Sequence, residues 1–220
     1  MEKYINILKK CPLFKGIEED NIVALLSCLN AQAREYDRNE FIFIAGERTK
    51  YIGIVLRGAV HILREDYMGE RTVLTNIERG ELFGEAFSCA EVDSIPVSVL
   101  AAKKSKILLI DYKRIITSCS AACTFHKGLI KNMIKILAQK NIMLTQKIDI
   151  ITKKTTREKL LAYLFEHARK SGKSNFTIPF DRQELADFLA VERSAMSAEI
   201  SRMQHDGIIK TNRSFFELLI

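Results

Sequence analysis

With 220 residues, 47% of them hydrophobic, the chain has enough apolar material for two small domains or one large one, which argues against disorder. No apolar run reaches the roughly 18 residues that a membrane span needs, and charge interrupts the amino-terminal segment too early for a signal peptide. Five cysteines, none in a C-x-x-C pair, argue against a secreted disulfide framework, so we expect a cytoplasmic protein with no membrane partner.

The positive charge of the chain is concentrated in one segment. The formal net charge is +7, but residues 1–125 carry 17 basic and 17 acidic side chains, residues 126–154 carry 7 and 1, and residues 155–220 carry 10 and 9. A polyanion such as DNA would explain the excess of lysine in the central segment. A helix with a solvated charged face would explain it equally well, so charge alone leaves both explanations open.

The first 111 residues predict a β-rich domain with a helical lead-in. From residue 39 to residue 111, short runs such as FIFI, YIGIVLRGAVHIL, RTVLTNI and KILLI alternate apolar and polar residues between turns, which is typical of antiparallel strands. Six of the ten glycines fall in this region, which suits the tight turns of a small barrel or jelly roll. The preceding LFKGIEEDNIVALLSCLN has the pattern of an amphipathic helix.

Residues 112–152 change to a helical period and contain no proline. Spacings of four and three follow the a/d pattern of a coiled coil and predict a dimer interface, which we name the a/d seam. The a/d seam comprises Ile130, Ile134, Leu137, Asn141, Leu144, Ile148 and Ile151. Its one polar residue, Asn141, is of the kind that fixes a two-stranded register.

A second stripe on the same helix competes for burial. It comprises Leu129, Met133, Ile136 and Met143. Two alternatives therefore stay open: the helix packs only on its own domain, or it uses one stripe for its own domain and the other for a twin helix.

Residues 153–220 predict a winged helix-turn-helix. One helix ends at the turn SGKS, and Asp181 with Glu184 three residues later then forms a capping box at the start of a helix pair. Ala190 and Val191 make the tight turn between the two helices, and IIKT and FFELL predict the strands of a wing. One side of the second helix is apolar. The opposite side shows Arg193, Ser194, Ser197 and Arg202.

A β-domain, a long helix and a winged helix-turn-helix in this order resemble the family of bacterial transcription regulators that includes the cyclic-AMP receptor protein and the fumarate-nitrate reductase regulator. PLFKGI, GELFGE followed by VSVLA, and DRQELADFLAVERSAMSAEISRM carry the resemblance over nearly the whole chain. It implies an α+β protein with three parts: a cyclic-nucleotide-binding-like jelly-roll barrel that senses an effector (1–111), a dimerisation helix (112–152) and a DNA-binding domain (153–220).

In this family the second helix of the winged unit enters the DNA major groove, and the protein binds duplex DNA as a homodimer on a near-palindromic operator. The implied DNA-facing residues are Arg193, Ser194 and Ser197 at base edges and Arg182 and Gln183 at phosphates. Arg193 is the best candidate for direct readout, because arginine can bind guanine O6 and N7 together. Ser194 stands where the family often has a glutamate, so we expect an operator that differs from that of the cyclic-AMP receptor protein. An activator of this family would also contact RNA polymerase.

The segment GELFGEAFSCAEVDSIPVSVLA, residues 80–101, contains four carboxylates and no lysine or arginine. Gly84 and Glu85 match the cyclic-nucleotide-binding members, but Ile95 and Pro96 stand where those members carry an arginine and a hydroxyl. Without a cation, burial of a phosphate would be costly. The expected effector pocket comprises Gly84, Glu85, Ile95 and Pro96, with Leu144 and Thr145 from the long helix. We expect an unidentified small neutral or cationic effector there, or none, and not a cyclic nucleotide.

Several alternatives remain at this point. One is a cyclic-nucleotide-responsive regulator, and a second is a thiol sensor that uses Cys119 and Cys123, one helical turn apart. A cyclic-nucleotide signalling adaptor without DNA binding is a third.

Cofactor and enzyme classes are disfavoured by the residues present. An iron–sulfur cluster needs cysteines closer together than Cys11 and Cys28, and haem would have to use His61, the one histidine of the β-region. A metal-dependent barrel enzyme needs two or three histidines there. No hydrolase or phosphate-loop motif is present. We therefore expect no enzyme, no cofactor and no metal.

Overall fold

The computed structural model describes residues 2–117 and 124–219, which fall into two compact units, residues 1–139 and 140–220. The predicted cysteine pair, Cys119 and Cys123, lies outside the described residues. The boundary between the units falls inside the long helix α5, Thr124–Ile151, so this helix contributes to both.

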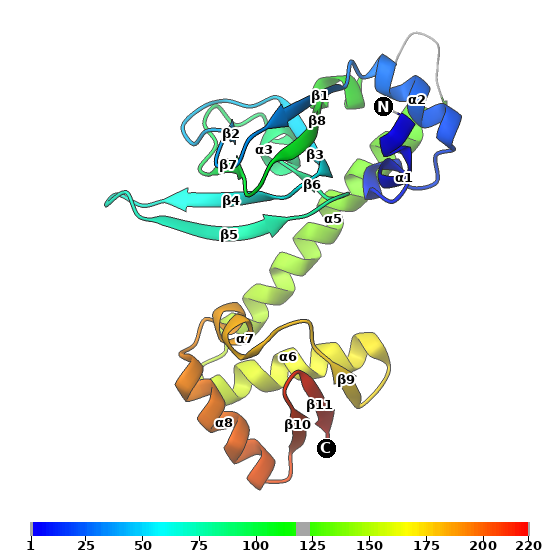
Figure 1. The fold of residues 1–220 in the computed structure, drawn as a ribbon. Coiled ribbons are helices and arrows are strands. Elements are labelled where there is room, and N and C mark those ends of the chain that lie inside the picture. Colours follow the sequence, from blue (N-terminus) through cyan, green and yellow to red (C-terminus); the bar gives the residue numbers. More distant parts are fainter. Residues whose placement is uncertain (1, 118–123, 220) are drawn as a thin grey trace. The chain divides into compact units, whose positions relative to one another are not determined.

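The first unit combines a helical lead-in with eight strands (Figure 1). The helical segments of the lead-in are η1 (Glu2–Tyr4), α1 (Ile5–Leu8), η2 (Pro12–Phe14) and α2 (Glu19–Cys28). The strands are β1 (Gln32–Tyr36), β2 (Phe41–Phe43), β3 (Tyr51–Arg57), β4 (Val60–Glu65), β5 (Arg71–Ile77), β6 (Leu82–Phe83), β7 (Ser98–Ala101) and β8 (Ser105–Asp111). Two short helices, α3 (Glu85–Cys89) and α4 (Tyr112–Ile116), complete it with the first half of α5. The predicted continuous helical segment 112–152 is thus divided into α4 and α5.

The eight strands form two antiparallel four-stranded sheets, in the orders β1-β8-β3-β6 and β2-β7-β4-β5. The arrangement is like a jelly roll, as predicted, but it is a pair of sheets and not one closed barrel. Apolar side chains from the two sheets meet in one core, which includes Phe43, Ile95 and Leu109.

Strands β3 and β8 are buried on both faces. Alternate residues of β3, such as Val55, join the core between the sheets, whereas Ile52 and Ile54 join a second core against the lead-in helices. The nearly continuous apolar runs YIGIVL and KILLI follow from this double burial, because a strand covered on both faces needs no polar side.

One stripe of α5 packs on the first unit. Leu129, Met133 and Ile136 are buried in the core with the lead-in helices, and the Asn132 amide donates hydrogen bonds to the carbonyls of Leu13 and Lys15, both at 2.9 Å. The fourth residue of that predicted stripe, Met143, is exposed.

Most of the a/d seam is left uncovered in the single chain. Ile134, Leu144 and Ile148 are 62%, 62% and 56% exposed, and Asn141 is exposed as well. Ile130, Leu137 and Ile151 are half-buried, and Leu137 packs against the core of the first unit.

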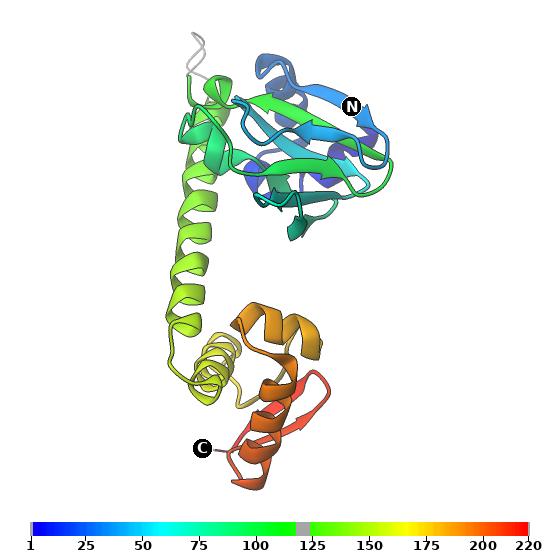
Figure 2. The ribbon, with the colours of Figure 1, turned by 90° about the vertical axis from the view of Figure 1, so that its left-hand side faces the viewer.

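The second unit is a winged helix-turn-helix, as predicted (Figure 2). Its elements after α5 are α6 (Thr156–Ser171), β9 (Asn175–Thr177), α7 (Arg182–Leu189), α8 (Arg193–His205), β10 (Ile209–Asn212) and β11 (Phe215–Leu218). The three strands pair in the order β10-β11-β9. Among the described helices, none is both long and apolar enough to cross a membrane.

Local signals place the ends of these helices. Asp181 accepts a hydrogen bond from the Glu184 amide at 2.9 Å and Glu184 accepts one from the Asp181 amide at 2.8 Å, which is the predicted capping box. At the other end, Ala190 has a left-handed conformation with φ of +51° and turns the chain toward α8.

Candidate functional site

Helix α8 has one buried and one exposed side. Met196, Ile200 and Met203 are each at most 3% exposed and fix the helix on the core of the second unit. Arg193 and Ser194 are exposed on its first turn, and Ser197, half-buried, follows one turn later. The exposed side therefore presents hydrogen-bond donors suited to base edges, with a long cationic side chain at its start.

Both predicted phosphate-facing residues have partners within the unit. The Arg182 guanidinium lies 5.1 Å from the centre of the Phe216 ring and donates to Thr211 Oγ1 at 3.3 Å. The Gln183 amide donates to Asp187 Oδ1 at 2.9 Å. Arg182 thus links α7 to the wing, a structural contact that the sequence alone did not reveal.

An ion-pair network that sequence reasoning missed joins α6 to α8. Arg202, predicted on the exposed face, donates to Glu199 at 3.1 Å. Glu199 is also 3.5 Å from Arg157, which donates to Asp206 at 2.7 Å. Arg202 is therefore tied to its own helix, and Arg193 has no acidic partner among the described residues.

The wing carries a further cation. Arg213 is exposed at the turn between β10 and β11, with φ of +53°. The sequence predicted this turn at Asn212 and Arg213. Arg213 becomes a candidate for a DNA contact only when the hairpin is known to lie beside α8.

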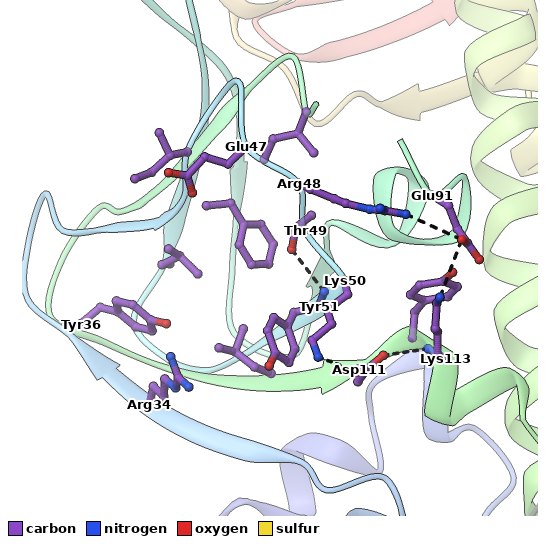
Figure 3. Close-up of a pocket in the computed structure, with 16 residues that line it drawn as sticks. Arg34, Tyr36, Glu47, Arg48, Thr49, Lys50, Tyr51, Glu91, Asp111 and Lys113 are labelled. Atoms are coloured by element: carbon purple, nitrogen blue, oxygen red, sulfur yellow. Dashed lines mark hydrogen bonds and ion pairs between the residues drawn. The ribbon is translucent and has the colours of Figure 1, made fainter. Parts of the chain in front are cut away.

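The first unit contains a cavity of about 650 Å³ (Figure 3). Its apolar lining includes Tyr36, Phe43, Ile95 and Leu109, all buried. Its charged lining comprises Arg34, Glu47, Arg48, Lys50, Glu91, Asp111 and Lys113. An apolar floor with charged groups at its edge is a general feature of small-molecule sites.

Five of the seven charged residues of this cavity form ion pairs with one another (Figure 3). Glu91 lies 3.9 Å from both Arg48 and Lys113, and Lys50 lies 3.4 Å from Asp111. The neighbouring Tyr112 hydroxyl and these two cations lower the pKa of Glu91. The sequence of residues 80–101 shows only carboxylates. The fold brings two cations to Glu91, Arg48 from the β2–β3 loop and Lys113 from α4.

Ile95, which stands where the cyclic-nucleotide-binding members carry an arginine, is part of the core. Ile95 is 1% exposed, its amide donates to the Glu47 carbonyl at 3.0 Å, and its carbonyl accepts from the Gly46 amide at 2.9 Å. Pro96 is exposed and has no amide hydrogen. No backbone donor is left at this point for an anion.

The beginning of the same segment is tightly packed. Gly84 has φ of +80°, and a Cβ there would lie 2.8 Å from the Phe43 ring, so only glycine fits. Glu85 is buried at the start of α3. Leu144 and Thr145, the predicted contribution of the long helix, are exposed and belong to the second unit. Their part in an effector pocket stays a prediction.

The other sensor candidates are dispersed. Cys11 is buried, and burial raises the pKa of its thiol to about 11, which disfavours the reactive thiolate. Cys28 is exposed, and His61 is half-buried in β4. Residues 2–117 and 124–219 contain no group of three or more histidine, cysteine, aspartate or glutamate side chains placed to hold a metal ion.

Comparison with known proteins gives two family matches. The cyclic nucleotide-binding domain family matches residues 33–121, and the Crp-like helix-turn-helix domain family matches residues 158–219. The cyclic AMP receptor protein of Thermus thermophilus is 23% identical over 206 residues, covering 92% of this chain and 90% of the relative.

Solved structures share the fold. The Thermus thermophilus catabolite activator protein is 21% identical, with a TM-score of 0.51 and coverage of 94% of this chain and 93% of that chain. The c-di-GMP-responsive global regulator CLP of Xanthomonas campestris is 18% identical, with a TM-score of 0.56 and coverage of 89% and 98%. At these identities the structural likeness bears on the fold alone.

The two family matches follow one another along the chain in the order of the effector domain and the DNA-binding domain, and a full-length relative spans both. The chain therefore belongs to the family of transcription regulators that includes the cyclic-AMP receptor protein and the fumarate-nitrate reductase regulator.

Proposed function

We propose that this transcription regulator is a homodimer that reads a near-palindromic operator with α8 and responds to an effector other than a cyclic nucleotide. The observation that carries the DNA-binding part is the exposed side of α8. Arg193 and Ser194 project from its first turn, while the opposite side is held in the core by Met196 and Ile200.

Of the three arginines predicted to face DNA, Arg182, Arg193 and Arg202, only Arg193 is without a partner among the described residues. Arg182 stacks on Phe216 and Arg202 is paired with Glu199, so moving either to DNA would cost an existing contact. Arg193 has no such cost, and a bidentate arginine–guanine contact contributes about 1–3 kcal/mol of discrimination.

The a/d seam supports the dimer. Ile134, Leu144 and Ile148 are more than half exposed in the single chain, on the same helix whose other stripe is buried in the first unit. Burial of one such side chain contributes about 1.5–3 kcal/mol, so a twin helix would gain from covering all three. A two-fold dimer would place its two half-sites about 10–10.5 bp apart or a multiple of that.

The effector part rests on Ile95 and Pro96. Both amide positions are closed to an anion, and the cations Arg48 and Lys113 already face Glu91. The alternative is a nucleotide-responsive protein. The names of one relative and one solved structure include cyclic AMP and c-di-GMP, and Arg48 and Lys113 are cations that a nucleotide phosphate could contact. If the protein activates transcription, RNA polymerase is a further partner.

The test is selection of binding sites from random DNA with wild-type protein and with Arg193→Ala. We expect the wild type to select a near-palindrome. The Arg193→Ala variant should lose about 1–3 kcal/mol of affinity and relax its preference at one base pair in each half-site.

Arg169→Ala is the matched control, since Arg169 is exposed on α6 and ion-paired with Glu166, away from the α8 face. It should leave the selected sequence unchanged. An Arg193→Ala protein with the same sequence preference as the wild type would show that α8 does not read bases through this residue.

A further inference from the structure

A hollow of about 240 Å³ lies wholly within the first unit, where the lead-in meets α5 (Figure 1). The lead-in contributes Lys10, Pro12 and Lys15, and α5 contributes Asn132, Lys135, Ile136 and Gln139. None of these residues belongs to the a/d seam, to the predicted DNA-facing set or to the larger cavity of the first unit.

The two sides of the hollow are held together by hydrogen bonds and by the core. The Asn132 amide donates to the carbonyls of Leu13 and Lys15, both at 2.9 Å. Leu13 and Phe14 are fully buried and Ile136 is 5% exposed, all in the core that joins the lead-in to α5. The elements that carry the lysines are therefore fixed relative to one another before any ligand binds.

All the charge that lines the hollow is positive. Lys10, Lys15 and Lys135 line it, and no carboxylate of the described residues does. Within residues 2–117 and 124–219 none of these three lysines has an ion-pair partner, although Lys9, next in the sequence, pairs with Glu19 at 3.3 Å. All three are exposed, so their ammonium groups can contact an anion without the loss of an existing ion pair.

The sequence of α5 adds to this unbalanced charge. Lys127, Lys131 and Lys135 follow one another at intervals of four, which places three like charges along one side of the helix. Like charges at this spacing destabilise a helix. The one acidic residue of α5, Asp149, stands 14 positions beyond Lys135. An anion bound beside Lys135 would reduce the repulsion.

The kind and number of these cations favour phosphate groups. Lysine binds phosphate as a point charge, whereas arginine is the residue whose two parallel hydrogen bonds match a planar carboxylate. A phosphate monoester carries a charge of about −1.5 to −2 at pH 7, so two phosphate groups balance three lysines. The exposed Gln139 amide, with no hydrogen-bond partner in the described part of the chain, adds a neutral donor. The volume is below the roughly 300 Å³ at which ordinary small-molecule pockets begin, so the hollow suits a compact group.

We propose that this hollow binds a diphosphate group, held between Lys10 and Lys15 of the lead-in and Lys135 of α5, with Gln139 as a neutral donor. Inorganic pyrophosphate and the diphosphate of a nucleotide share this chemistry. A single phosphate balances fewer than three lysines and spans less of the hollow.

A bound diphosphate would connect two segments that are far apart in the chain. Lys15 and Lys135 are 120 positions apart, and the bound anion would add ionic contacts to the Asn132 hydrogen bonds that already join these segments. Because the ligand binds the folded protein, it should also raise the melting temperature.

The experiment is calorimetric titration of the full-length protein, without DNA and at about 0.15 M salt, where charges more than about 8 Å apart are largely screened. We expect pyrophosphate to bind with a dissociation constant below about 1 mM and orthophosphate to bind at least about 10-fold more weakly. Equal affinity for the two anions, or no binding of pyrophosphate at about 5 mM, would overturn the assignment.

ADP, titrated in the same way, distinguishes the sources of the diphosphate group. An affinity for ADP equal to or above that for pyrophosphate supports a nucleotide ligand, and binding of pyrophosphate alone supports a free diphosphate. Either result supports the assignment only if the lysine variants weaken the binding.

Lys15→Met and Lys135→Met should each weaken pyrophosphate binding by about 5-fold or more, since each removes one of three charges. Gln139→Glu keeps the size of the side chain but places a carboxylate in the hollow, and should weaken binding by about 10-fold or more. Lys131→Met is the matched control, because Lys131 is exposed on the same helix, one turn before Lys135, and does not line the hollow. It should leave the affinity unchanged. Unchanged affinity in both Lys15→Met and Lys135→Met would place pyrophosphate elsewhere on the protein and contradict the assignment.

Thermal unfolding separates a ligand contact from a structural one. Lys135 has no ion pair to lose, so Lys135→Met should not lower the melting temperature of the free protein, and it should reduce the rise that pyrophosphate causes in the wild type. A variant that is less stable than the wild type and binds pyrophosphate equally well would show that Lys135 acts in the fold, and the assignment would be wrong. These measurements use no DNA, so their result is independent of how α8 acts.

Discussion

Ala190 ends α7 in the left-handed region, with φ of +51°, although it carries a Cβ. An L-residue pays about 1–2 kcal/mol for this conformation, and glycine relieves it at the expense of more freedom in the unfolded chain. We therefore expect Ala190→Gly to raise the free energy of unfolding by about 0.5–1 kcal/mol in denaturant titrations. Ala198→Gly, inside α8 and equally exposed, should lower it by about 1 kcal/mol. A loss of stability in Ala190→Gly would mean that the alanine methyl makes a contact that outweighs the strain.

Ile95 and Pro96 decide whether the first unit can bind a cyclic nucleotide. We expect neither cyclic AMP nor cyclic GMP to bind with a dissociation constant below about 50 μM, equivalent to roughly −6 kcal/mol, in calorimetry at millimolar nucleotide. The reason is that the side chain of Ile95 and its backbone groups are both committed to the core.

Two variants make that titration decisive. Ile95→Arg combined with Pro96→Ser should create measurable affinity, provided that thermal unfolding shows a folded protein, because it returns a cation and a hydroxyl. Arg48→Ala tests the opposite explanation. Tight nucleotide binding by the wild type that disappears in Arg48→Ala would show that the cations from outside the segment take the place of the missing arginine.

Arg157 links the start of α6 to the end of α8. Its hydrogen bond at 2.7 Å holds the pKa of Asp206 below the ordinary 3.8. A carboxyl whose folded pKa is lowered contributes stability above its unfolded pKa, and this contribution is lost as the pH falls through the folded value. We expect the wild type to lose stability more steeply than Asp206→Asn below about pH 4, measured by thermal unfolding at a series of pH values. Parallel curves for the two proteins would show that the link between the helices makes no contribution.

The elements themselves were largely predictable, because each is set by local signals. The capping box at Asp181 and Glu184, the Ala190 turn and the strands of the wing could all be read from the sequence and are present. The sequence did not predict the division of residues 112–152 into α4 and α5. Residues 112–116 also have a helical pattern, so they look like the start of the longer helix.

The candidate sites were predicted less completely, because they depend on residues far apart in the chain. The fold brings Arg48 to Glu91, and no sequence motif links the two residues. Arg182 was predicted to face phosphates, but its guanidinium lies over the ring of Phe216 in the wing. The contact between the Tyr163 and Phe188 rings could not be expected at all, since the two residues are 25 positions apart. A sequence pattern predicts whether a side chain is on the buried or the exposed face of its element. Which side chain it contacts depends on tertiary packing.

The oligomeric state of the protein can be tested at the a/d seam. Ile134 and Ile148 are the cleanest seam positions to change, because Leu137 also packs against the core of the first unit. We expect Ile134→Asp and Ile148→Asp each to give monomers at micromolar concentration in analytical ultracentrifugation, while wild type sediments as a dimer. Gln139→Asp, exposed on the same helix outside the a/d seam, should remain dimeric. A wild-type monomer under these conditions would contradict the role of the a/d seam.

The core behind β3 and β8 bears on where this protein can be cut. The cyclic nucleotide-binding family match covers residues 33–121, but Leu8, Leu13, Phe14, Leu129 and Met133, which cover the outer face of that sheet, all lie outside the matched span. A fragment trimmed to the matched borders would expose one apolar patch to water, and such patches favour aggregation. The patch comprises Ile52, Ile54, Leu108 and Ile110. The smallest autonomous folding unit is consequently longer at both ends than the evolutionary domain, and its last component is the very helix on which dimerisation is proposed.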